Sequence, residues 1–207
     1  MKIKVGETEL DFLCDWSVGI GGSLWTNGHL LVDHLQRRAS YYAPLCHEKR
    51  ILEVGSGTGL VGLALTACFA PKEVVLTDLS SHLNVLQTNV GGNVAVLPKS
   101  SQIKVAELEW GKTSMDVKGI FDVIVGTDVA YAEELYAPLI ATLKTHADEH
   151  TIILLGLNRN DTNLNFFAQL EKAGFNYYKC YHDTMDPEME GKDCAIFEVR
   201  LVNGRTT

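Results

Sequence analysis

The sequence predicts an α/β fold, a doubly wound and mostly parallel sheet of seven strands with an antiparallel last strand, preceded by a short β-hairpin and helix. From Arg50 onward, short apolar runs alternate with segments of helical period, which is typical of βαβ units. A glycine-rich turn directly follows the first of these runs. The last two runs have no helical segment between them, so they are expected to pair antiparallel at an edge of the sheet.

Residues 1–45 are expected to extend the domain at its N-terminus. Apolar residues alternate on either side of Gly6-Glu7, which favours a hairpin that turns there. A leucine-rich run of helical spacing follows. The expected elements are strands at Lys2–Val5 and Thr8–Leu13 and a helix at Asn27–Ala39.

Residues 46–207 are expected to form the α/β core. Its strands are the short apolar runs at Ile51–Val54, Val74–Thr77, Ile103–Ala106, Phe121–Gly126, Thr151–Gly156, Tyr177–Tyr181 and Ala195–Leu201. Its helices are expected to begin near Gly59 and to cover Leu79–Val90, Leu135–Leu143 and Leu164–Leu170. Ligands bind beyond the carboxyl ends of the strands in such sheets, so residues directly after strands are candidates for chemistry.

Length and composition fit one globular domain, residues 1–207. Hydrophobic residues make up 46% and charged residues 21%, which excludes disorder and coiled coil. The longest nearly apolar stretch, Gly59–Ala70, is shorter than the roughly 20 residues that cross a bilayer, so no membrane segment is expected. A net charge of -8 argues against a nucleic acid partner and leaves room for a basic partner or for solubility alone. A monomer is compatible with these properties.

The cysteines and histidines give no metal-binding pattern. The five cysteines contain no Cys-x-x-Cys pair, and no secretory signal opens the sequence, which favours reduced thiols in the cytoplasm or nucleus. His146 and His150 are spaced four apart, but no cysteine or carboxylate clusters with them. We therefore expect no metal site.

The turn after the first core strand reads Glu53-Val54-Gly55-Ser56-Gly57-Thr58-Gly59. Glycines allow a sharp turn and let a ligand approach the backbone closely. The helix that follows offers its first, unpaired amides to that ligand. No Gly-Lys-Ser/Thr follows the turn, which excludes a P-loop.

A dinucleotide site is an alternative for this turn. Three glycines match its G-x-G-x-x-G fingerprint, namely Gly57, Gly59 and Gly62. Counted from Gly55, where the strand ends, the third glycine position instead falls on Leu60. The carboxylate of Glu53 would repel a pyrophosphate and attract a ligand that carries an amino group. The acid therefore favours an amino-bearing ligand.

A second acid, Asp78, ends the next core strand 23 positions after Gly55. A carboxylate at about that distance is placed to hold the ribose hydroxyls of a nucleoside. The alternative is that Asp78 caps the helix that follows it. Together, Glu53, the glycine turn and Asp78 fit a nucleoside that bears an amino acid. S-adenosylmethionine has that composition.

Four stretches of the chain follow one another in a specific order. They are Leu24-Trp25 before a leucine-rich helix, Glu53–Gly62, Leu108-Glu109-Trp110-Gly111, and Val125–Tyr131 with an Asp-x-x-Tyr signature. In this order they resemble the Rossmann-like class I S-adenosylmethionine-dependent methyltransferases, and more narrowly the methyltransferase-like family 16 of protein lysine methyltransferases. The resemblance runs from about Ser23 to Leu201. It implies S-adenosylmethionine as cofactor and a protein substrate; chaperones and translation factors are targets in that family.

The resemblance also implies a role for each matching residue. The cofactor site would comprise Trp25 closing over the ligand, Glu53, the loop residues Gly55, Ser56 and Gly57, Asp78 on the ribose, Trp110 beside the adenine and the backbone of Thr127. Asp128 and Tyr131 would lie at the methyl-transfer end. Structural alternatives exist: each tryptophan could be packing alone, and Asp128 could cap the next helix.

Transfer of a methyl group from a sulfonium to lysine needs an unprotonated amine, whose pKa is normally about 10.4. Burial beside a sulfonium would lower that pKa, and we expect Asp128 to anchor the incoming ammonium while Tyr131 orients it. The predicted function is protein lysine N-methylation. The alternatives are the same fold acting on histidine or a small-molecule amine, a catalytically silent cofactor-binding module, and a nicotinamide-dependent oxidoreductase.

The stretch Asp183–Lys192 between the last two strands is acidic. It holds Asp183, Asp186, Glu188 and Glu190 against a single lysine. One hypothesis is that it steers a lysine-bearing protein surface toward the cofactor edge. The alternative is a solvated turn without such a role.

Overall fold

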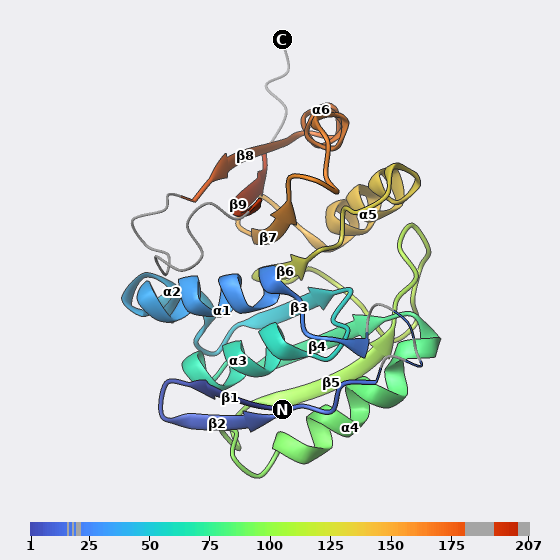
Figure 1. Ribbon diagram of the computed structural model, residues 1–207. Coiled ribbons are helices and arrows are strands. Elements are labelled where there is room, and N and C mark those ends of the chain that lie inside the picture. The colour runs from blue at the N-terminus through green and yellow to red at the C-terminus, as the bar shows by residue number, and fades with distance from the viewer. Residues whose placement is uncertain (16, 18, 20–21, 181–192, 203–207) are drawn as a thin grey trace.

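The computed structural model shows a central seven-stranded sheet with helices on both faces and a two-stranded hairpin beside it (Figure 1). The structure describes residues 1–207 except 16, 18, 20–21, 181–192 and 203–207. Every helix in these described ranges is too short or too polar to span a bilayer.

The sheet has the strand order β5-β4-β3-β6-β7-β9-β8. Its strands are β3 Arg50–Val54, β4 Glu73–Asp78, β5 Gln102–Glu107, β6 Val123–Thr127, β7 Ile152–Asn158, β8 Phe175–Lys179 and β9 Cys194–Leu201. Strands β3 to β7 pair in parallel, while β9 pairs antiparallel with both β7 and β8. The predicted doubly wound sheet with an antiparallel last strand is confirmed.

The order in which strands are added to the sheet reverses between β3 and β6. From β3 it winds outward through β4 to β5, and then returns to place β6 on the other side of β3. The carboxyl ends of β3 and β6 are therefore neighbours while their connections diverge. This is the switch point at which doubly wound sheets bind ligands.

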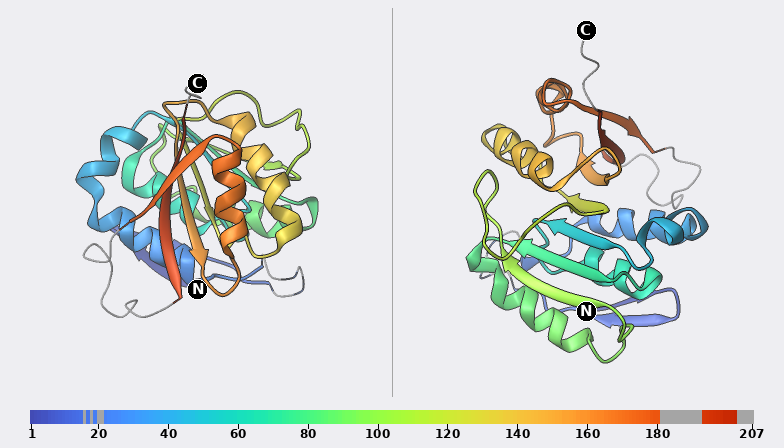
Figure 2. Two further views of the ribbon diagram at one scale, coloured as in Figure 1. Left: turned by 90° about the horizontal axis from the view of Figure 1, so that it is seen from above. Right: turned by 180° about the vertical axis from the view of Figure 1, so that it is seen from behind.

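Successive residues of each central strand point to opposite faces of the sheet, and each face has its own core. Ile51 packs in one core with α1 and α3, whereas Leu52 packs in the other with α5 and α6. Figure 2 shows α1 and α2 on one side of the sheet and α5 and α6 on the other. The helices are α1 Thr26–Arg37, α2 Ala39–Cys46, α3 Leu60–Phe69, α4 Leu83–Asn93, α5 Glu133–His146 and α6 Leu164–Lys172.

The hairpin strands β1 Lys2–Val5 and β2 Thr8–Asp11 pack against α3 and α4. The predicted second strand extended to Leu13, which is wrong by two residues. Two α4 asparagines end the pairing, because Asn93 accepts the backbone N–H of Asp11 at 2.8 Å and Asn89 accepts that of Leu13 at 2.7 Å. These bonds anchor the end of the hairpin to the helix.

Other predicted boundaries are also corrected. Strand β6 starts two residues later than predicted, because Phe121 donates its backbone N–H to the carbonyl of His146 at the end of α5. The predicted end of strand β8 at Tyr181 lies outside the described residues. The helix predicted over residues 79–90 is a 3₁₀ turn, Ser80–His82, followed by α4. The prediction stopped the first helix at Ala39, but a second helix, α2, starts there and tolerates Pro44 in its interior. Strand β8 starts two residues earlier than predicted, because Gly174, at φ 94°, ends the preceding helix and buried Phe175 pairs at once with Leu201.

Candidate functional site

The glycine turn lies between β3 and α3, at the switch point of the sheet. Gly55, Gly57 and Gly59 have φ values of 62°, 53° and 83°, in the left-handed region that favours glycine. A Cβ added to Gly55 would lie 3.0 Å from a methyl of Val129 and 3.1 Å from Cζ2 of Trp110. The structure therefore brings Trp110 against the glycine turn.

Glu53 lies beneath this turn rather than open to a ligand. Its residue is 2% exposed, and its Oε2 accepts the backbone N–H of Gly62 in the first turn of α3 at 3.0 Å. Burial raises its pKa to about 8, against the weaker opposing effect of the bond from Gly62. The carboxyl group is therefore placed to brace the turn and the helix, and we correct the expectation that it attracts an amino group directly.

Glutamine at position 53 is expected to flatten the pH dependence of stability. Between the ordinary glutamate pKa and about 8, folded Glu53 holds a proton that the unfolded chain releases, so the free energy of unfolding falls as pH rises. From pH 5 to 9 the wild type should lose on the order of 4 kcal/mol more than Glu53→Gln. Glutamine keeps an acceptor for Gly62 and does not titrate.

Urea unfolding at pH 5, 7 and 9 measures this difference. Glu107→Gln changes an exposed glutamate at the end of β5 and should follow the wild-type curve. Parallel pH curves for the wild type and Glu53→Gln would contradict the prediction.

The side chain of Ser56 is also turned into the protein. Its Oγ accepts the backbone N–H of Thr77 at 2.9 Å, and its own N–H donates to the carbonyl of Thr77 at 2.8 Å. Ser56 is 7% exposed. The serine thus ties the glycine turn to the end of β4, and its hydroxyl group is turned away from a ligand.

Asp78 ends β4 and faces the glycine turn. Its Oδ2 accepts the N–H of Gly57 at 2.8 Å, while its Oδ1 accepts the N–H of Leu79 at 2.8 Å and lies 3.3 Å from Nδ1 of His82. The helix-cap alternative is wrong, because α4 begins only at Leu83 and its N-cap is His82. A carboxylate accepts about four hydrogen bonds, so lone pairs of Asp78 remain for hydroxyl groups.

The N-terminus of α1 reaches the same edge. Trp25 is its N-cap and is 43% exposed, which fits a side chain able to cover a ligand. Asn27, two residues later, is 1% exposed, and its Nδ2 donates to Oδ1 of Asp128 at 2.5 Å. No local pattern in the sequence predicts a role for Asn27, because its partner lies 101 residues away.

Asp128 follows β6 and has an unusual backbone. Its φ is 55°, and its N–H donates to the carbonyl of Gly156 on the neighbouring strand β7 at 2.8 Å. Burial raises its pKa, the bond from Asn27 opposes that shift, and the charge of Asp161 adds to it. The cap alternative is wrong for Asp128 as well, since the N-cap of α5 is Ala132.

Thr127 and Tyr131 flank Asp128 on either side. Thr127 is the last residue of β6 and pairs with Gly156, so its backbone lies at the carboxyl edge. Tyr131 is 46% exposed at the rim. Partial burial raises the pKa of its phenol and the charge of Asp78 adds to the rise, so the hydroxyl stays protonated and can donate a hydrogen bond.

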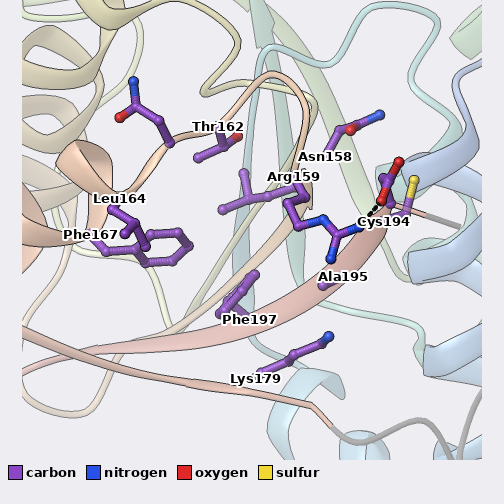
Figure 3. Close-up of a pocket in the computed structure, with 12 residues that line it drawn as sticks. Asn158, Arg159, Thr162, Leu164, Phe167, Lys179, Cys194, Ala195 and Phe197 are labelled. Atoms are coloured by element: carbon purple, nitrogen blue, oxygen red, sulfur yellow. Dashed lines mark hydrogen bonds and ion pairs between the residues drawn. The ribbon is translucent and has the colours of Figure 1, made fainter. Parts of the chain in front are cut away.

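A cavity of about 670 Å³ lies at the carboxyl end of β7, between β9 and α6 (Figure 3). Leu157, Phe167 and Phe197 give it apolar walls, and an ion pair between Arg159 and Asp193 lies at its rim. Thr162 in its wall donates to the carbonyl of Ala130 at 2.8 Å, which joins the cavity wall to the segment after Asp128. The acidic stretch 183–192, predicted at this edge, lies outside the described residues.

Comparison with known proteins gives one family for most of the chain. Residues 4–173 match a family described as lysine methyltransferase. A mouse protein named protein N-lysine methyltransferase METTL21A is 32% identical over 196 residues, which cover 92% of this chain and 83% of that protein. The mouse protein named EEF1A lysine methyltransferase 3 is 29% identical, covering 86% and 79% of the two chains.

Solved structures agree with this chain in fold. A S-adenosylmethionine-dependent methyltransferase from Clostridium acetobutylicum superimposes with a TM-score of 0.63 at 10% identity, covering 91% of this chain and 96% of that one. The glycopeptide N-methyltransferase MtfA, solved with S-adenosyl-L-homocysteine, gives a TM-score of 0.60 at 12% identity, covering 83% and 89%.

Proposed function

Because this chain belongs to the lysine methyltransferase family, we propose that it transfers methyl groups from S-adenosylmethionine to a lysine side chain of a protein. The observation that carries the proposal is the meeting of the glycine turn with Asp128 at the switch point, where β3 and β6 lie side by side. Two of the four stretches that carry the resemblance, the glycine turn and the segment with Asp128, therefore lie at one edge of the sheet.

The residues at this edge fit the cofactor. The absence of a Cβ at Gly55 lets Trp110 lie against the glycine turn, and Asp78 has lone pairs left for ribose hydroxyls. Trp110 would lie along the adenine and Trp25 would cover the ligand from α1, while the backbone of Thr127 would line the site. Glu53 and Ser56 would support the turn from beneath. When bound, the cofactor supplies the electrophilic methyl group.

The chain's own residues would prepare the acceptor. A lysine ammonium that enters this edge meets the carboxylate of Asp128, and the phenol of Tyr131 lies three residues away at the rim. Charge attraction would orient the amine, and exclusion of water would favour loss of its proton. Catalysis in this scheme is positioning and desolvation, without a covalent bond to the protein.

The substrate class follows from the relatives' names alone. One similar protein is named for lysine methylation of EEF1A, and another is named a protein N-lysine methyltransferase. We propose a protein target, with chaperones and translation factors as the first classes to test. The five cysteines are free thiols, which supports the proposal of a cytoplasmic or nuclear location.

A labelling experiment tests the proposed function. The protein is incubated with a cell lysate and S-adenosylmethionine that carries an isotopically labelled methyl group, and mass spectrometry locates the label. We expect label on lysine of one or a few proteins, and none above background with Asp128→Ala. Label on histidine or on small amines would reject lysine as the acceptor. Calorimetry that detects binding of NADH but not of S-adenosylhomocysteine would reject the cofactor.

A further inference from the structure

Two buried oxygens beside the glycine turn have no hydrogen-bond donor. They are Oδ1 of Asn27 and Oδ2 of Asp128. In the part of the chain that the structure describes, only two other buried side-chain atoms lack a partner, one each on His82 and Ser101. The first two differ from these because they belong to side chains that already bond to each other, at 2.5 Å between Nδ2 and Oδ1.

The fold holds the two side chains together from separate elements. Asn27 lies in the first turn of α1, whereas Asp128 follows β6 in a left-handed conformation. Gly156 on β7 makes the approach feasible, since a Cβ there would lie 3.2 Å from Cβ of Asn27 and 2.9 Å from a methyl of Thr127. The backbone N–H of Asp128 is fixed by the carbonyl of Gly156. The arrangement is therefore built by three elements at the ligand edge.

The bond between Asn27 and Asp128 determines what the remaining atoms can do. The amide nitrogen donates to one carboxylate oxygen, which leaves the amide oxygen and the second carboxylate oxygen. Both remaining atoms are acceptors when the carboxyl group is ionised. Buried acceptors without a donor are unfavourable, so they indicate a ligand that donates to both of them.

A primary ammonium has the chemistry that these two oxygens require. It presents three N–H donors from one atom, and its positive charge complements the carboxylate. A hydroxyl group has only one donor and no charge, and a phosphate or carboxylate would be repelled by Asp128. The pair therefore selects an amine in its charged form.

We propose that Asn27 is a ligand-binding residue whose Oδ1, together with Oδ2 of Asp128, forms a two-acceptor seat for a primary ammonium. The inference rests on the proposed function, which brings two such groups to this edge: the α-ammonium of the cofactor and the ammonium of the acceptor lysine. Asn27 also positions Asp128, because its Nδ2 fixes the rotation of the carboxylate.

Two pairs of ligands distinguish the two sources. The first pair is S-adenosylhomocysteine and its deaminated analogue with a butanoate tail. The second pair is the aza-analogue of S-adenosylhomocysteine whose nitrogen carries either a 2-aminoethyl arm or a propyl arm of similar size. Within each pair only one ammonium is changed, so the affinity ratio measured by calorimetry reports what holds that ammonium.

In the wild type we expect the ammonium-bearing member of one pair to bind at least about tenfold more tightly than its partner. Asn27→Ala should reduce that ratio to near one while the other pair keeps its wild-type ratio. If the ratio of the first pair falls in Asn27→Ala, the seat holds the α-ammonium of the cofactor. If the ratio of the second pair falls, the seat holds the ammonium of the acceptor lysine. A ratio is used because general damage to the site would weaken both members of a pair equally.

Two further variants complete the test. Thr26→Ala changes an exposed residue in the same helical turn and should keep both ratios. Asp128→Asn retains the shape of the side chain but puts a donor or a neutral oxygen where the charge was. It should bring the same affinity ratio to near one as Asn27→Ala does. It also provides the measurement if the alanine variant does not fold.

The outcomes separate the seat from the proposed function. Both ratios unchanged in Asn27→Ala and Asp128→Asn, or both near one in the wild type, would overturn the seat. If one of these results is found but the wild type binds S-adenosylhomocysteine, only the seat is wrong and the proposed function stands. If it binds none of the four compounds, the proposed function fails, and the seat fails with it.

Discussion

Alanine at position 128 is expected to lower the rate of methyl transfer by at least about 10³-fold while S-adenosylhomocysteine still binds. Asp128 holds its carboxylate beside the amide of Asn27, and its backbone N–H is fixed to Gly156. Without that carboxylate, the acceptor ammonium has no charge partner to orient it. The glycine turn and Asp78 still hold the nucleoside, so any loss of affinity should stay near tenfold.

The measurement is single-turnover transfer of labelled methyl to the lysine protein that the lysate experiment identifies, with calorimetry on the same preparation. Glu133→Gln serves as a control, because Glu133 is an exposed acid in the first turn of α5. It should transfer methyl groups within about twofold of the wild-type rate. If Asp128→Ala retains a tenth of the wild-type rate, the anchoring role is wrong.

Tyr131 and Asp128 show what a local motif can predict. Both belong to an Asp-x-x-Tyr stretch, and the structure places Asp128 in a left-handed turn after β6 with the phenol at the rim. The motif determined that a strand ends there and that an acid follows it. It contained no information on Asn27, which approaches Asp128 only because α1 packs across β7 at Gly156.

The parallel core was predictable because its strands are apolar on both faces. Ile51 and Leu52 enter different cores, and such continuous runs mark buried parallel strands. The boundaries of β8 were harder to predict from the sequence, since its tyrosines form an exposed or half-buried edge. Its true start depends on the backbone of Gly174, a signal that the apolar pattern did not include.

The role of Glu53 could not be derived from its place in the motif. An acid two residues before a glycine turn can point toward the ligand or away from it, and sequence spacing does not distinguish the two. The structure places the carboxyl group against the first turn of α3, because Gly62 lacks a side chain: a Cβ there would lie 2.7 Å from Oε2 of Glu53. The glycine thus explains the direction of the acid.

Asp78→Ala is expected to weaken the binding of S-adenosylhomocysteine by about 100-fold. The carboxylate has two functions in the proposed complex. It holds the N–H of Gly57 at 2.8 Å, which fixes the glycine turn, and it offers its remaining lone pairs to the ribose hydroxyls. Alanine removes both. Asp78→Asn keeps an acceptor for Gly57 but loses the charge, so its loss should be about tenfold.

Calorimetry with S-adenosylhomocysteine and with its 2′,3′-dideoxy analogue separates these two functions. The wild type should bind the dideoxy compound more weakly by about tenfold or more, whereas Asp78→Ala should bind both compounds with the same affinity. Asp116→Ala, which changes an exposed acid after Trp110, should retain the wild-type ratio. If Asp78→Ala still prefers the ribose hydroxyls as strongly as the wild type does, the carboxylate only braces the turn. The ribose would then be held by another group.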